Sequence, residues 1–480
     1  MSTLRSTTRS GSKGGSATQR GAVGAIGAIA LACISCAGEP TPGPSTPSVM
    51  PPLHVQAMPP ADPAPVVDGD ITVASANGIR ILVKRIPGAE LTAAQLYIRG
   101  GVSNWTEANA GIELLALRTA TSGGTQQLDK DAFSRRLTTL GSEVSYSVTN
   151  DYSAIEQKSL TTAFDPTFDL LVQAFLTPAM PDNEIELNRQ RQLLGIRREQ
   201  ETPDGRLGLL VLDAMWSGHP YHARSSGTVE SVGALTSAAL RAHLDRLRET
   251  SRLELVVVGD VAADHVIERV KTAFAKLPRG NFQDKPLPVP KFDKSRLLLK
   301  EAELPTTYIM GSFPGPSWGS PELAAGVIAM RILHDRVWEE VRTKRNLSYA
   351  PSAGFRFGSE VTRGTLYVTA VDANTTWKVM LDEVKKLAET PVPAADLAGS
   401  KAQFLTGHLA SNESTGGQAS WLGMCDLLGG DYRLARTMPE RIAQVKAEEV
   451  RAFVNNRVLH LQTAVLGDAS KLDRALFESR

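Results

Sequence analysis

Cysteine is scarce in this chain of 480 residues, and its cysteines are unevenly placed. Two of the three, Cys33 and Cys36, lie near the N-terminus, and only Cys425 lies in the rest of the sequence. One cysteine cannot form a disulfide framework within that region, and it cannot form a metal site built on several thiolates. Both of these site types are therefore excluded for the body of the chain.

The chain also lacks an excess of charge of either sign. Its formal net charge is +1, with 21% charged and 42% hydrophobic residues, as is usual for soluble globular proteins. Nucleic-acid binding usually needs a basic face, so we expect no nucleic-acid partner. Beyond the N-terminal segment, no apolar run approaches the roughly 20 residues that a membrane-spanning helix needs.

Histidines that could share a metal ion are scarce as well. Of the eight, only His219 and His222 are close, and Pro220 between them favours a loop over the helix that would aim both rings together. We interpret this segment as a structural turn. The others are His54, His243, His265, His334, His408 and His460, which are isolated and which we interpret as packed or surface residues.

The N-terminus is predicted to be a targeting segment. A short apolar region of small residues, 21–34, follows four basic residues: Arg5, Arg9, Lys13 and Arg20. Small residues precede two cysteines, which resembles a bacterial lipoprotein signal with Cys36 as the lipidated residue and Cys33 as the alternative. A plain signal peptide or a retained anchor is the other interpretation.

Residues 37–67 are rich in proline and poor in bulky apolar side chains, so we expect an extended tether. A lipid, a tether and a folded body together predict a cell-envelope protein, lipid-anchored in the periplasm or at the outer membrane. The peptide that follows the tether is the part of the chain that can form a core.

That body contains an internal repeat. The segment QLYIRGGVSN around Tyr97 aligns with TTYIMGSFPG around Tyr308, an offset of 211 residues, and three further pairs of segments align at offsets of 208–212. Steady offsets across separated segments indicate duplication. We therefore divide the chain as follows: signal peptide 1–36, tether 37–67, first domain 68–280, linker 281–294 and second domain 295–480.

Each repeat has the same coarse order of elements. Strands with alternating apolar positions come first, a helix follows (110–120 and 322–341), and further strands and helices lead to LELVVVGDV or LQTAVLGDA. Antiparallel strands with helices on one face form an α+β layer, so the fold class is α+β with two homologous layered domains.

One segment of the second domain carries residue types suited to binding a peptide. Arg342 is expected at a helix C-terminus, and Tyr349 follows it at the start of a strand. An arginine fork and a tyrosine hydroxyl are able to bind a peptide carbonyl or the oxyanion of a tetrahedral intermediate. The alternative is structural: an arginine favoured by the helix dipole and a half-buried strand tyrosine.

Taken together, residues 70–480 resemble the zinc peptidase family of pitrilysin, insulin-degrading enzyme and the mitochondrial processing peptidase. The resemblance rests on the order and spacing of AGIELLALRTATSGGT, FSRRLTTLGSEVSYSVTNDYSAI, HPYHARSSGTVESVGALTSAALRAHL, LVVVGDV and VRTKRNLSYAPSAGF. It implies a mitochondrial-processing-peptidase-like metallohydrolase fold that forms half of a clam-like chamber.

The family's zinc motif is missing. Active members carry His-x-x-Glu-His on the first long helix, which aligns here with the segment Leu114-Leu115-Ala116-Leu117-Arg118, beside Glu113. The third ligand would fall near Glu199 or Glu201, which we interpret as solvated helix charges. We therefore expect no metal on this chain, no cofactor of its own and no peptidase activity when it is alone.

The chain does retain an Arg/Tyr pair like that of the family, whose members use two such residues at the same spacing to hold the substrate backbone. The resemblance thus implies that Arg342 and Tyr349 bind substrate in a non-catalytic subunit, with zinc in a family paralogue as the partner. A homodimeric scaffold or a peptide-binding envelope protein is the alternative. One departure is that MRILHDR replaces two glycines that the family often has before the arginine.

Overall fold

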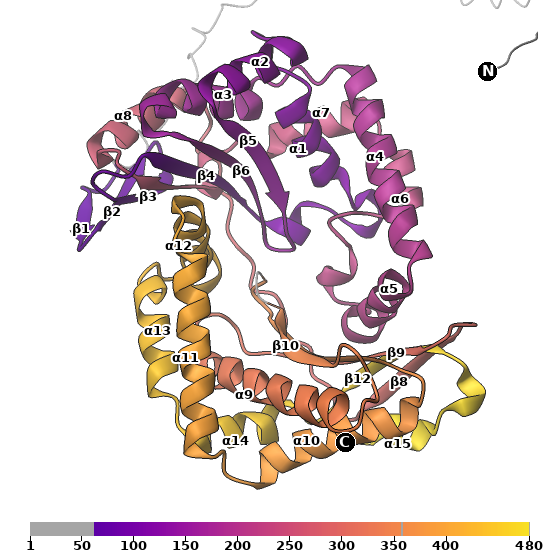
Figure 1. The fold of residues 1–480 in the computed structure, drawn as a ribbon. Helices are drawn as coiled ribbons and strands as arrows, with labels where there is room; N and C mark the ends of the chain where they lie inside the picture. Colours follow the sequence, from indigo (N-terminus) through magenta and orange to yellow (C-terminus); the bar gives the residue numbers. More distant parts are fainter. Residues whose placement is uncertain (1–61, 357–358, 480) are drawn as a thin grey trace, which may run out of the picture. The chain divides into compact units, whose positions relative to one another are not determined.

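Segments with alternating apolar positions in the first half of the chain form a seven-stranded sheet in a computed structural model, which describes residues 62–356 and 359–479 (Figure 1). The strand order is β1-β2-β3-β7-β4-β6-β5, and all neighbours are antiparallel except β3 and β7. The strands are β1 (Val66–Asp68), β2 (Ile71–Ala76), β3 (Ile79–Arg85), β4 (Leu91–Arg99), β5 (Glu143–Val148), β6 (Tyr152–Leu160) and β7 (Leu253–Gly259).

Eight helices accompany this sheet among the described residues. They are α1 (Ile112–Ser122), α2 (Lys130–Leu140), α3 (Phe164–Leu176), α4 (Asp182–Glu201), α5 (Pro203–Trp216), α6 (Val229–Ala234), α7 (Ser237–Leu247) and α8 (Ala263–Ala273). The apolar faces of α1, α3 and α7 pack with the inner side chains of the strands in one core cluster. This burial of one sheet face under helices is the main stabilisation of the layer.

The second half forms a five-stranded sheet in the order β10-β11-β9-β12-β8. Its strands are β8 (Arg296–Glu301), β9 (Thr307–Pro314), β10 (Ser352–Arg356), β11 (Arg363–Ala370) and β12 (Gln462–Gly467). Its helices are α9 (Glu322–Val337), the π-helical segment η6 (Trp338–Thr343), α10 (Ala373–Glu389), α11 (Ala394–Ser411), α12 (Thr415–Gly429), α13 (Leu434–Gln444), α14 (Ala447–Arg457) and α15 (Arg474–Glu478).

The two sheets have the same topology. The order β3-β7-β4-β6-β5 in the first corresponds strand by strand to β8-β12-β9-β11-β10 in the second, and in each the first two strands are parallel and the rest antiparallel. The predicted α+β class with two homologous layered domains is confirmed. Residues 281–294 form neither helix nor strand.

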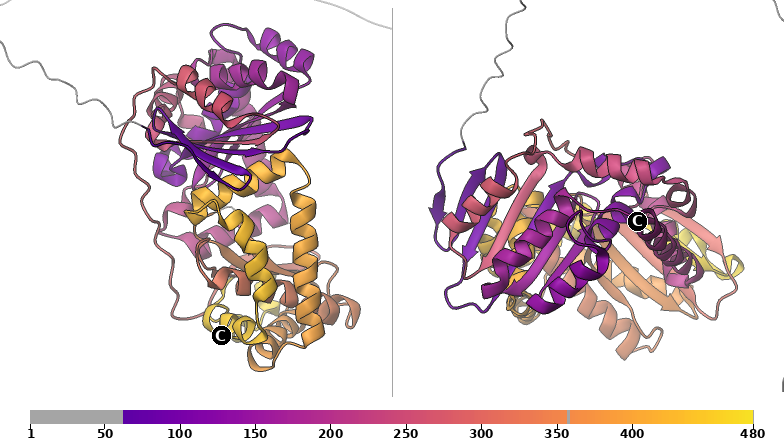
Figure 2. Two further views of the ribbon diagram at one scale, coloured as in Figure 1. Left: turned by 90° about the vertical axis from the view of Figure 1, so that its left-hand side faces the viewer. Right: turned by 90° about the horizontal axis from the view of Figure 1, so that it is seen from above.

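Each half lends one helix to the sheet of the other half. Helix α5 contacts β8, β9 and β12, while α12 contacts β4 and β7 (Figures 1 and 2). The two helices also begin in the same way: Thr202 caps α5 by accepting from Gly205 N at 3.2 Å, and Ser414 caps α12 by accepting from Gly417 N at 3.0 Å. Both sheets are thereby covered on both faces within residues 60–480, which form one compact unit.

The predicted tether ends earlier than residue 67. Asp62 accepts hydrogen bonds from Ser75 Oγ at 2.7 Å, Asn77 N at 2.7 Å and Gly78 N at 3.0 Å. Strand β1 then pairs with β2. The proline density of this region predicted an extended chain, but the β-branched pair at 66–67 and the Asp62 carboxylate attach its last residues to the body. Cys33 and Cys36 lie outside the described residues.

Candidate functional site

The segment that carries Arg342 reverses direction through a defined helix end. Helix α9 continues into η6, where Lys344 N donates to Glu339 O at 2.9 Å. Asn346 then adopts a left-handed conformation, with φ of +50°, and donates to Arg342 O at 3.1 Å, while Leu347 N donates to Val341 O at 2.8 Å. These two bonds, which reach back four and six residues, satisfy two of the last carbonyls of the helix and turn the chain back on itself.

The reversal brings Tyr349 onto Arg342. Arg342 Nη1 donates to the main-chain oxygen of Tyr349 at 2.9 Å, and Arg342 Cζ lies 4.1 Å from the centroid of the Tyr349 ring. Cζ also lies 4.4 Å from the centroid of the Trp338 ring, so two aromatic rings contact the guanidinium. We call Arg342 and Tyr349 the clasp.

Tyr349 differs from its predicted setting. It lies in the loop before β10 rather than at the start of a strand, and 78% of its surface is exposed. No hydrogen bond to its hydroxyl group is found within the described ranges. The left-handed turn at Asn346 reverses the chain before β10 begins at Ser352, which leaves Tyr349 in the intervening loop with its phenol in solvent.

The positive charge of Arg342 is also uncompensated. The neighbouring cations Lys344 and Arg345 both pair with Glu340, and their hydrogen bonds, that of Lys344 first, lower the pKa of Glu340 to about 2. Arg342 itself has no carboxylate within ion-pairing distance in the part of the chain that the structure describes. It uses one N–H on Tyr349 O, and the remaining donors of its fork are available to a ligand.

The face of α1 where the zinc motif aligns holds no metal-binding side chains. Leu115, Ala116 and Leu117 are buried in the core, so only Leu114 and Arg118 reach the outer side of the helix. Arg118 Nε donates to the Tyr146 hydroxyl at 2.6 Å. Within residues 62–356 and 359–479, no three His, Cys, Asp or Glu side chains converge as a metal site would need.

The two carboxylates near the place of the third ligand differ in environment. Glu199 Oε2 accepts from Arg224 Nη1 at 2.7 Å, so it is an ion-paired residue and not the solvated charge that we predicted. Glu201, by contrast, is exposed as expected. The pairing arises because the chain after η4 (Pro220–His222) returns past the end of α4, a long-range contact that the helical pattern of 182–201 does not reveal.

The predicted turn at 219–222 is confirmed. His219 Nδ1 accepts from Tyr221 N at 3.0 Å and caps η4. The His222 ring lies between Glu107, 2.6 Å from Nδ1, and Asp213, 3.0 Å from Nε2, and these two carboxylates, Glu107 first, raise its pKa. Because they approach opposite nitrogens, they cannot bind one metal ion together with the ring.

A buried pair was not foreseen from the sequence. His243 Nε2 lies 2.9 Å from Glu113 Oε2, with both side chains 1% exposed, and Glu113 also accepts from Ser153 Oγ at 2.5 Å and Asn104 Nδ2 at 3.1 Å. The available signal was the spacing Leu240-His243-Leu244-Leu247, which places His243 on the apolar face of α7. Its partner 130 positions away leaves no local trace.

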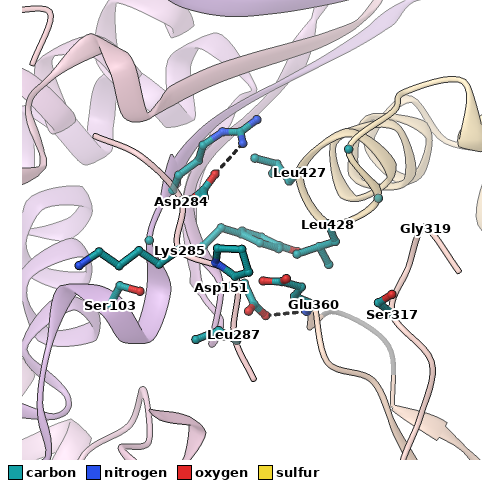
Figure 3. Close-up of a pocket in the computed structure, with 16 residues that line it drawn as sticks. Ser103, Asp151, Asp284, Lys285, Leu287, Ser317, Gly319, Glu360, Leu427 and Leu428 are labelled. Atoms are coloured by element: carbon teal, nitrogen blue, oxygen red, sulfur yellow. Dashed lines mark hydrogen bonds and ion pairs between the residues drawn. The ribbon is translucent and has the colours of Figure 1, made fainter. Parts of the chain in front are cut away.

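A cavity of about 380 Å³ lies where the two halves and the linker meet (Figure 3). Figure 3 shows Asp151 and Glu360 facing each other there, beside Asp284, Lys285 and Leu287 of the linker. Asp151 accepts from the Tyr221 hydroxyl at 2.5 Å and from Glu360 N at 3.1 Å, and burial raises its pKa to about 6. Neither residue of the clasp lines this cavity, so we interpret it as part of the junction.

Comparison with known families identifies the chain. Residues 80–228, which contain α1, match the family model described as insulinase (peptidase family M16), and residues 234–404, which contain the clasp, match the peptidase M16 inactive domain. The chain belongs to the M16 peptidase family. The resemblance that the sequence motifs indicated is therefore confirmed.

Relatives in the M16 family are distant in sequence. The chain is 21% identical over 397 residues to an uncharacterized zinc protease of Mycobacterium leprae, covering 79% of this chain and 87% of the relative. It is 20% identical over 385 residues to the non-peptidase homolog YmxG of Helicobacter pylori, covering 78% and 89%. Relatives of both descriptions are thus similar to this chain along most of their length.

The M16 fold is also found in solved structures. The crystal structure of a peptidase M16 inactive domain from Pseudomonas fluorescens superposes with a TM-score of 0.76 at 18% identity, covering 83% of this chain and 98% of that one. The inactive-domain match and the non-peptidase relative fit a catalytically inactive M16 homologue. The apolar and arginine side chains on the outer face of α1 agree with that description.

Proposed function

We propose that this chain is a non-catalytic, substrate-binding subunit of an M16 zinc peptidase, and that it supplies Arg342 and Tyr349 to a zinc-bearing family paralogue. The observation that carries the proposal is the clasp itself. Arg342, which has no carboxylate partner among the described residues, is held against the exposed Tyr349 and donates one N–H to its main-chain oxygen.

The chemistry of the clasp suits a peptide backbone. A guanidinium fork donates to a carbonyl oxygen or to the oxyanion that replaces it, and a phenol adds one further donor on a rigid ring. Such donors stabilise a transition state most when water is excluded. With Tyr349 exposed, this exclusion requires a second surface, which a partner closing over the clasp would provide.

The proposal also assigns the missing half of the chemistry to the partner. Zinc would sit in the paralogue, because Leu114 and Arg118 on this chain offer neither imidazole nor carboxylate to a metal. The names of the relatives support such a division, since the mycobacterial protein is called a zinc protease and the H. pylori protein a non-peptidase homolog.

We further propose that the complex is held in the cell envelope through a lipid on Cys36 or, as the alternative, on Cys33. Each described helix is too short or too polar to cross a membrane. Mass spectrometry of the N-terminal peptide from membranes of the native cell would detect the acylated cysteine, and an unmodified N-terminus in the membrane fraction would contradict this anchor.

The test is a reconstitution with the zinc-bearing paralogue purified from the same cell. Alone, the chain should contain no stoichiometric zinc and cleave no peptide, whereas the mixture should cleave. Arg342→Ala or Tyr349→Phe should lower turnover of the mixture by about 10²–10³-fold, the usual cost of removing an oxyanion donor. Assembly, measured by size-exclusion chromatography, should not change.

Arg345→Ala is the matched control, because it removes a cation from the same turn but one that Glu340 already neutralises. If the clasp variants leave turnover intact while the complex still forms, the chain acts as a scaffold or a peptide-binding envelope protein. Should the chain alone cleave peptides with bound zinc, the division of labour proposed above is wrong.

A further inference from the structure

Two arginines face each other on neighbouring strands at one end of the second sheet. The register of β10 and β11 pairs Arg356 directly with Arg363. Their side chains lie on the sheet face that receives α5, because Tyr367, on the same face as Arg363 at period two, donates from its hydroxyl to Asp204 of α5 at 2.6 Å. The pair therefore points toward the first half of the protein.

The charges of this pair are not neutralised. Like charges directly opposite each other in an antiparallel pair destabilise a sheet, whereas opposite charges stabilise it. No carboxylate of the described chain lies within ion-pairing distance of Arg356 or Arg363. Burial, and then the neighbouring Arg356, lower the pKa of Arg363 to about 10.

The pair lines a cavity of about 250 Å³ that the two halves build together. A third guanidinium, that of Arg224, lies in its wall with Tyr221, Asn150 and Ser359. Arg224 is balanced by Glu199 at 2.7 Å, the acidic residue that lines this cavity. The wall therefore holds three guanidinium groups against one carboxylate and has an excess of positive charge.

We infer that this cavity binds an oxyanion, which the Arg356–Arg363 pair receives as two forks and which removes their mutual repulsion. Phosphate and carboxylate groups both present the paired oxygens that guanidinium binds in a bidentate manner. The cavity has room for such a group but not for a folded partner. The site is separate from the clasp, since neither Arg342 nor Tyr349 lines it.

Two sources can supply this chemistry, a free phosphate compound or the carboxylate of a peptide. Binding of inorganic phosphate to the full chain would be measured by isothermal titration calorimetry in a phosphate-free, low-salt buffer. A second series would use one short peptide with a free C-terminal carboxylate and its amidated twin. A preference for the free acid over the amide assigns the site to peptide carboxylates, and binding of phosphate alone assigns it to free anions.

The variants Arg363→Gln and Arg356→Gln should weaken binding of the preferred anion by about tenfold or more, because each loses a charge-assisted hydrogen bond. Arg363→Lys keeps the charge but not the guanidinium fork, so its affinity for the anion should lie between that of the glutamine variants and that of the native chain. Arg296→Gln in β8 is the matched control: it is an exposed strand arginine without an ion pair among the described residues, and it should bind as the native chain does.

Melting temperatures give a second readout that does not depend on knowing the natural ligand. Without added anion, Arg356→Gln should melt at or above the native temperature because it relieves a repulsion, and phosphate should raise the melting temperature of the native chain but not of this variant. If neither anion binds the native chain, or if the Arg363 and Arg356 variants bind as the native chain does, the site does not exist.

Discussion

Gly423 of α12 lies directly against the ring of Tyr97 in β4, so that a Cβ atom at position 423 would come within 2.5 Å of Tyr97 Cε2. Tyr97 is 3% exposed and its ring cannot move away. We expect Gly423→Ala to lower the free energy of unfolding by about 1–3 kcal/mol through overpacking. In the same helix nothing lies within 4 Å of a Cβ added at Gly416, so Gly416→Ala should leave the free energy of unfolding unchanged or raise it slightly. Urea unfolding would measure both variants.

The clasp depends on the left-handed turn at Asn346. A β-branched residue is strained at φ of +50°, whereas glycine accepts it, so Asn346→Val should destabilise the protein by about 1–2 kcal/mol and Asn346→Gly should cost little. In the reconstituted complex the valine variant should also lower turnover, because Tyr349 no longer returns to Arg342. Equal unfolding curves for the two variants would contradict this role of the turn.

Stability should depend on the protonation of Asp151. Its pKa is about 6 in the folded protein and 3.8 in the reference state, so between these pH values the folded state binds a proton that the unfolded state releases. This contribution is complete below pH 3.8 and is lost as pH rises through 6, by up to about 3 kcal/mol. The difference in unfolding free energy between the native protein and Asp151→Asn should therefore decline from pH 4 to pH 7, whereas a constant difference would show that Asp151 titrates normally.

The buried pair of Glu113 and His243 should be sensitive to the loss of either partner. Removing one side chain leaves the other without its partner in the core, and we expect Glu113→Ala or His243→Ala to cost about 3–5 kcal/mol. Thermal unfolding would measure this loss. Glu201→Ala, an exposed carboxylate of the same half, should change stability by no more than about 0.5 kcal/mol. Similar losses in all three variants would rule out a special role for the pair.

The sequence predicts the architecture well because periodic patterns are local and the repeat supplies each pattern twice. The helices predicted at 110–120 and 322–341 correspond to α1 (Ile112–Ser122) and to α9 with η6 (Glu322–Thr343), and each half contains the strands that the duplicated apolar segments predicted. The pairing of Arg342 with Tyr349 was within reach because seven residues separate them. The exposed loop position of Tyr349 was not, since it depends on one left-handed residue that asparagine permits but does not require.

Contacts between distant segments were invisible for a different reason. The pairs Glu113–His243 and Glu199–Arg224 each form only when separate elements are placed by the fold. The sequence analysis missed the attachment of residue 62 to the body. A high proline content indicates that a segment forms no core, but one aspartate side chain can still accept hydrogen bonds from a turn of the body. Apolar periodicity therefore predicts the layers of the fold, but it does not predict which polar side chains of different layers contact each other.

Because α12 of the second half covers the sheet of the first half, that sheet is synthesised long before the helix that covers it. The first sheet is complete at Gly259, but the helix that covers its second face begins only at Thr415. At about 5–20 residues per second, a ribosome needs roughly 8–30 s to make the intervening stretch. During that interval the apolar surface around Tyr97 and Val256 is exposed to solvent and can associate with other proteins. A first half released early should therefore aggregate or be bound by a chaperone.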